Sequence, residues 1–128
     1  MYIYDLYEAI LEESKSEKRA IKSSLRVLLT HLLKLKYQQN YAGENSWIES
    51  IQNSHFNIKD QFKGVGKGAL YNSFYMKKLD LESIYKDARK KASLETGLPI
   101  KTFPEKCPWD KESLVDRDFI YDFINKYK

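Results

Sequence analysis

The chain contains an amphipathic stretch at residues 19–37, which reads RAIKSSLRVLLTHLLKLKY. Its apolar side chains recur at steps of three and four residues, the spacing of one face of an α-helix: Ile21, Leu25, Leu28, Leu29, Leu32 and Leu35. At roughly 100° per residue, polar side chains gather on the opposite face: Arg19, Arg26, Thr30, Lys34 and Tyr37. We therefore expect a central core helix over residues 5–37, with His31 at the border between its two faces.

A second helix is predicted to begin at Ser46, because Ser46 and Glu49 have the spacing of a capping box. One stripe of this helix is mostly apolar: Trp47, Ile51, His55, Ile58 and Phe62. Since His55 occupies an apolar position of the stripe, we expect its side chain to be buried. Three glycines at residues 64–68 are unfavourable inside a helix, so the helix is expected to end before them.

A third helix has clear signals at both ends. Asp80 can act as its N-cap, and Gly97 suits the left-handed residue just beyond its C-terminus. An extended, proline-stiffened crossing is expected over residues 99–108. Asp110 can then cap one more short helix before the apolar C-terminal segment. No strand pattern is visible, so we expect a single all-α domain over residues 1–128, a compact helical bundle of three main helices plus one or two short C-terminal helices.

Composition excludes several protein classes. The chain has 128 residues and 42% hydrophobic content, enough for one independent core. Its single cysteine, Cys107, excludes an intramolecular disulfide, and the N-terminus has no leader-like pattern, so we expect a cytoplasmic protein. The longest apolar run, residues 27–35, is far shorter than a membrane span of about 20 residues. With two histidines and one cysteine, neither a metal site nor a cofactor is expected.

The formal net charge is +4, but it is unevenly distributed. Residues 1–17 are acidic, whereas residues 18–40 contain six bases and no acid. These bases, with a tyrosine able to stack on a nucleobase, predict contact with nucleic acid or another polyanion: Arg19, Lys22, Arg26, Lys34 and Tyr37. A second basic cluster lies at residues 86–91. A solvated helix face with charges matched to the helix dipole explains the same gradient without a ligand.

Two other functions are open. The two histidines could meet other polar side chains in one cleft and give a metal-independent, nuclease-like enzyme: His31, His55, Tyr85 and Arg89, with Lys34 beside them. Ordinary buried histidines, each hydrogen-bonded to a carbonyl or hydroxyl, account for the same residues. Alternatively, ten tyrosines exceed what a chain of this size must bury, which favours a protein interface and a homodimer.

Several short motifs occur in a fixed order along the chain: His31-Leu-Leu-Lys34, Ser46-Trp47, Tyr85-x-x-Ala88-Arg89, Glu95-Thr96-Gly97-Leu98, Phe103-Pro104 and Cys107-Pro108. Over residues 12–119 the chain resembles domain-of-unknown-function family twenty-nine, which is known mainly from bacteria. The resemblance implies an all-helical fold and no assigned activity. The chain departs from the family pattern in a shorter N-terminal stretch, in His55 where members have arginine, and in the glycines from Gly64 where members have a serine-proline turn.

Overall fold

The structure is a computed structural model that describes residues 3–38, 44–63 and 79–127, with side chains described at 19–38, 44–60 and 79–127. All regular elements in these ranges are helices: α1 (Ile3–Tyr37), α2 (Glu44–Lys63), α4 (Leu81–Thr96), the 3-10 turn η1 (Ile100–Thr102), α5 (Lys111–Val115) and α6 (Arg117–Tyr127). The predicted all-α bundle, three main helices with one or two short C-terminal ones, is confirmed.

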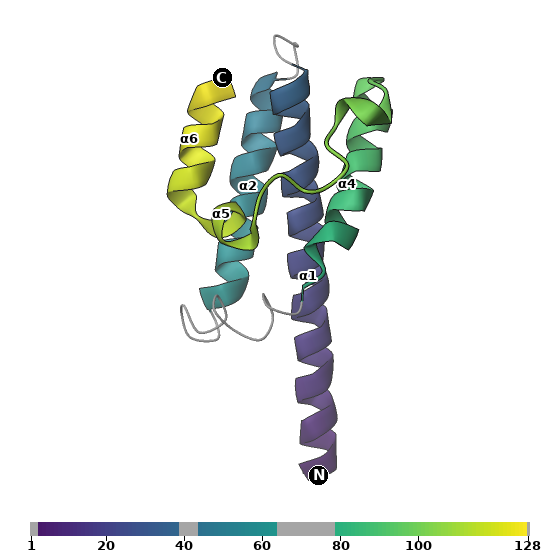
Figure 1. The fold of residues 1–128 in the computed structure, drawn as a ribbon. Coiled ribbons are helices and arrows are strands. Elements are labelled where there is room, and N and C mark those ends of the chain that lie inside the picture. Colours follow the sequence, from purple (N-terminus) through teal and green to yellow (C-terminus); the bar gives the residue numbers. More distant parts are fainter. Residues whose placement is uncertain (1–2, 39–43, 64–78, 128) are drawn as a thin grey trace.

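Helix α1 is the centre of the bundle (Figure 1). It packs against α2 on one side and α4 on the other, and α6 lies beyond α2. The leucine stripe forms the core of these contacts and is almost completely buried: Ile21, Leu25, Leu28, Leu29, Leu32 and Leu35. With 35 residues, α1 is about 50 Å long, and its N-terminal part projects past the other described helices (Figure 1).

The polar face predicted for α1 is only partly exposed. Thr30 and Lys34 have 1% and 7% of their surface exposed, and Tyr37 is half-buried. These side chains are covered because α4 packs along this side of α1. The Thr30 hydroxyl is satisfied inside the helix, since it donates to the carbonyl of Arg26 at 2.7 Å.

Helix α2 begins at Glu44, two residues before the predicted N-cap Ser46, which therefore lies in the first turn. Its inner stripe is buried as predicted: Trp47, Ile51, His55 and Ile58. The fifth residue of the predicted stripe is Phe62, whose side chain lies outside the described part of the chain. The glycines at residues 64–68 lie outside it as well.

The predicted caps of α4 and α5 are confirmed. The Asp80 carboxylate accepts a hydrogen bond from the Ser83 amide at 3.1 Å, and the Asp110 carboxylate accepts one from Ser113 at 2.8 Å. The hydrogen bonds from the Ser113 amide and side chain hold the pKa of Asp110 below its usual value. Gly97 follows α4 with φ of 77°, the left-handed conformation that glycine adopts without strain. Local sequence thus sets where both helices begin.

Candidate functional site

Tyr85 and Arg89 hold the crossing between η1 and α5 against α4. The Tyr85 hydroxyl donates to the carbonyl of Pro104 at 2.5 Å. The Arg89 guanidinium donates to the carbonyl of Phe103 from Nε at 3.2 Å and from Nη2 at 3.0 Å. Phe103 is buried and packs edge-on against Tyr37, with ring centroids 5.5 Å apart. Burial raises the pKa of Tyr85 far above its usual value, so the hydroxyl remains a donor.

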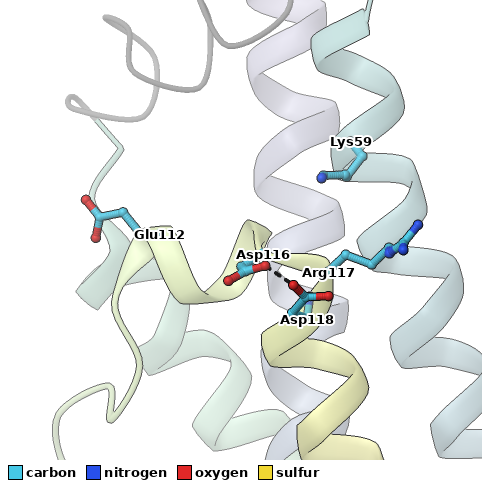
Figure 2. A pocket seen from close by; sticks show the side chains of 5 residues that line it. All are labelled: Lys59, Glu112, Asp116, Arg117 and Asp118. Carbon is cyan, nitrogen blue, oxygen red and sulfur yellow. Dashed lines mark hydrogen bonds between the residues drawn. The ribbon is translucent and has the colours of Figure 1, made fainter.

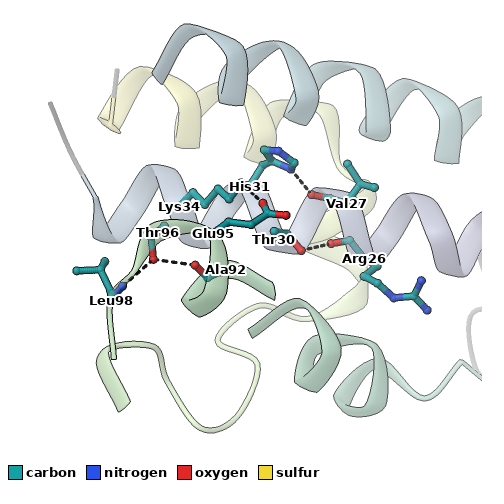
Figure 3. A network of polar contacts seen from close by, with 9 residues as sticks. All are labelled: Arg26, Val27, Thr30, His31, Lys34, Ala92, Glu95, Thr96 and Leu98. Carbon is teal, nitrogen blue, oxygen red and sulfur yellow. Dashed lines mark hydrogen bonds and ion pairs between the residues drawn. The ribbon is translucent and has the colours of Figure 1, made fainter. Parts of the chain in front are cut away.

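His31 is satisfied within its own helix. Its Nδ1 donates to the carbonyl of Val27 at 2.8 Å (Figure 3). Partial burial lowers its pKa, and the positive charges of Lys34 and Lys91 act in the same direction. The neutral ring is therefore favoured near neutral pH, with Nε2 as its remaining acceptor.

The most unusual polar contact is an ion pair between Lys34 of α1 and Glu95 of α4 (Figure 3). The Lys34 ammonium is almost fully buried and lies 5.8 Å from the centre of the Trp47 ring, a cation–π distance. Partial burial opposes ionisation of Glu95, but the hydrogen bond and charge of Lys34 outweigh it and lower the pKa of the carboxyl. Lys34 thus links three helices: it belongs to α1, it pairs with Glu95 of α4, and it lies over the Trp47 ring of α2.

His55 connects α2 to α5. It is buried, as predicted, and its Nε2 donates to the carbonyl of Val115 at 3.1 Å. Burial lowers its pKa, and Lys59 adds to this effect while Asp116 opposes it. Because the neutral ring uses one nitrogen as donor, its other nitrogen is an acceptor.

The structure does not bring the four predicted catalytic side chains into one cleft. Tyr85 and Arg89 lie together and hold the crossing, His31 lies beside the Lys34 ion pair, and His55 is hydrogen-bonded to α5. The pocket that His55 lines contains none of the other three side chains. The nuclease-like hypothesis stays a prediction, and the positions of its residues add nothing in its favour.

The predicted nucleic-acid face is divided. Arg19 and Lys22 are exposed, and Arg26 is half-buried with its Nε 3.9 Å from the Asp87 carboxylate. Lys34 and Tyr37 are not available to a ligand, because Lys34 pairs with Glu95 and Tyr37 packs on Phe103. The second basic cluster, on α4, contributes exposed side chains instead: Lys86, Lys90 and Lys91.

An apolar groove between α2 and α6 was missed by sequence reasoning. It encloses about 260 Å³ and is lined by both helices: Gln52, His55, Phe56, Lys59, Arg117, Ile120, Tyr121 and Ile124. A polar pocket of about 500 Å³ adjoins it at Lys59 and Arg117 and is otherwise acidic (Figure 2): Glu112, Asp116 and Asp118. Spacing within each helix could have suggested these faces, but only the packing of α2 on α6 brings them together.

Among the described side chains, no group of three or more histidine, cysteine or acidic residues is placed to hold a metal ion. None of the described helices has both the length and the apolar character of a membrane span.

The family model described as Domain of unknown function DUF29 matches residues 3–120. The chain belongs to this family. The match begins nine residues earlier than the predicted resemblance, at residue 3 instead of residue 12. A search of curated proteins and a search of solved structures each gave no match.

The DUF29 motifs are far apart in the sequence but make contact with one another. The His31–Lys34 motif meets the Glu95–Leu98 motif through the ion pair of Lys34, and Trp47 lies beside the same ammonium. The Tyr85–Arg89 motif binds the carbonyls of the Phe103-Pro104 motif. In this DUF29 chain the motif residues therefore hold the helices together.

Proposed function

We propose that this DUF29 protein is a cytoplasmic binding module that contacts a polyanion, with nucleic acid as the favoured partner, through a basic surface on α1 and α4. This basic surface consists of Arg19, Lys22, Lys86, Lys90 and Lys91, all exposed. The observation that carries the proposal is the packing of two basic segments side by side. Residues 19–37 and 81–96 together contain nine bases and three acids.

Each of the three acids of these segments interacts with another residue of the same chain. Asp87 lies within ion-pair distance of Arg26, and Glu95 pairs with Lys34. Glu82 accepts hydrogen bonds from the amide of Cys107 at 3.0 and 3.2 Å. In the described part of the chain, Lys86, Lys90 and Lys91 have no ion pair with these acids. The surface therefore presents more positive than negative charge to an approaching anion.

The residues favour contact with phosphates over recognition of bases. The aromatic side chain expected to stack on a base, Tyr37, packs against Phe103 instead. Exposed lysine and arginine side chains suit the sequence-independent contacts that a nucleic-acid backbone offers. A duplex, which keeps its bases stacked and its phosphates outside, is thus the favoured partner.

Binding can be tested by fluorescence anisotropy with a labelled duplex over about 50 to 200 mM salt. We expect the logarithm of the association constant to fall linearly with the logarithm of salt concentration. Lys90→Ala should make the slope shallower by about 0.9, the value for one lost phosphate contact on B-DNA. Lys126→Ala removes the same charge from the last turn of α6. Since α6 lies on the opposite side of α1 from α4 (Figure 1), this variant should leave the slope unchanged.

Two results would overturn the proposal. One is the absence of binding at the lowest salt concentration. The other is binding that Arg19→Ala/Lys22→Ala and Lys90→Ala reduce no more than the Lys126→Ala control does.

A further inference from the structure

The groove between α2 and α6 has the form of a receptor for a helix. On α2 it is lined by residues spaced i, i+3, i+4 and i+7: Gln52, His55, Phe56 and Lys59. On α6 the lining residues have the same spacing: Arg117, Ile120, Tyr121 and Ile124. Each helix thus presents one continuous face to the groove. Two such faces side by side are the usual seat of an amphipathic helix.

The groove is apolar between two exposed aromatic rings. Phe56 on α2 and Tyr121 on α6 have 62% and 67% of their surface exposed, and Ile120 and Ile124 are buried. Large exposed apolar side chains that flank one groove are typical of an interaction site. An occupant with an apolar stripe would cover both rings.

The charges on the groove itself are positive. Lys59 and Arg117 line it, and no acid does. In the adjoining pocket, Arg117 extends toward α2 (Figure 2), and the acids Glu112, Asp116 and Asp118 line that pocket but not the groove. The Asp116 carboxylate accepts a hydrogen bond from the Asp118 amide at 3.0 Å, which holds it at the N-terminus of α6. An occupant with acidic residues beside its apolar stripe fits this arrangement.

We propose that the groove binds residues 3–17 of a second copy of this chain. These residues form the first turns of α1. Their sequence repeats apolar residues at helical spacing: Ile3, Leu6, Tyr7 and Ile10. They also contain five acids and only one base, Lys15. The segment thus has both properties that the groove selects.

The chain cannot place this segment in its own groove. Helix α1 is continuous from Ile3 to Tyr37, and residues 21–35 of the same helix are fixed in the core. Its N-terminal part projects past the described ends of α2 and α6 (Figure 1). A second copy has no such restriction, and reciprocal insertion fills both grooves in a closed two-fold dimer.

The full chain can be tested by sedimentation equilibrium over a range of concentrations. We expect a mass of twice 15.2 kDa that dissociates on dilution. Phe56→Glu and Tyr121→Glu should each raise the dimer dissociation constant by about tenfold or more, as loss of a central aromatic contact does. Leu94→Glu places the same charge on a residue of α4 that is 83% exposed and outside the groove, so it should have no effect.

The role of residues 3–17 is tested by the double variant Leu6→Glu/Ile10→Glu in the full chain. This variant should raise the dimer dissociation constant as much as Phe56→Glu does. Circular dichroism checks that each variant keeps its helical content. A monomer at every concentration overturns the proposal. So does a dimer that resists the two groove variants, or one that breaks with Phe56→Glu but not with Leu6→Glu/Ile10→Glu, because another surface would then fill the groove. The salt-dependence test of Lys90 concerns a different face and succeeds or fails separately.

Discussion

Loss of Glu95 should destabilise the fold more than loss of its partner Lys34. The two side chains are unequally buried: 9% of the Lys34 side chain is exposed, against 38% of the Glu95 side chain. Glu95→Ala leaves an ammonium almost out of contact with water and without its carboxylate. Lys34→Met fills nearly the same volume with an apolar chain and leaves a carboxylate that water can solvate.

The magnitude follows from this asymmetry. Removing one partner of a buried ion pair costs about 3 kcal/mol or more when the other charge stays buried. Glu95 lies in the last turn of α4, where the helix dipole disfavours a negative charge, so its removal raises the free energy of unfolding by about 0.5 kcal/mol. The cation–π contact of Lys34 with Trp47 is present with and without Glu95, so it does not enter this difference. Glu95→Ala should therefore lower the free energy of unfolding by about 2.5 kcal/mol, and Lys34→Met by at most about 1 kcal/mol.

Urea denaturation followed by circular dichroism measures both values. The double variant Lys34→Met/Glu95→Ala should be more stable than Glu95→Ala alone, because it no longer buries an unpaired charge. Asp122→Ala, at an exposed position of α6, is the control and should change stability by less than about 0.5 kcal/mol. Equal losses in the two single variants, or a larger loss in Lys34→Met, would refute the role assigned to burial of Lys34.

Two further predictions concern the cap of α4 and the buried histidine. Gly97→Ala should cost about 1 kcal/mol and Gly97→Asn clearly less, because φ is 77° and nothing lies within 4 Å of an added Cβ, so only backbone preference acts; equal losses in thermal unfolding would contradict this. The pKa of His55 is lowered in the folded chain, so the stability it contributes is present above its unfolded pKa of about 6.5 and is lost as pH falls. His55→Gln should accordingly flatten the decline in unfolding free energy between about pH 7 and 5, and an unchanged decline would count against it.

Features encoded by neighbouring residues could be predicted from the sequence. The caps at Asp80, Gly97 and Asp110 depend on side chains and backbone within a few residues, so local rules were sufficient. Burial of His55 followed from its place in an apolar stripe, since the periodicity of a helix fixes which side chains share a face.

The position of Lys34 could not be predicted in this way. It lies on the polar side of the leucine helix, and nothing nearby in the sequence indicates that this side is covered. Its partner Glu95 is 61 residues away, and the two meet only because α4 packs along α1 in the same direction. The α2–α6 groove was missed for the same reason, because each of its faces is an ordinary exposed helix face until the helices pack.

The residues that identify the family and the residues proposed to bind partners are largely different sets. Lys34, Glu95 and Arg89 belong to the motifs and bond to other parts of the same chain. Lys90 on the basic surface and Phe56 on the groove are outside the motifs and have exposed side chains. Variants of the first set should therefore lower stability and leave both binding assays unaltered. In the second set, Lys90→Ala should change the salt slope and Phe56→Glu should change the dimer dissociation constant, each with little effect on stability. The DUF29 motif residues thus hold the helices of this chain together, whereas the two surfaces proposed to bind partners lie outside the motifs.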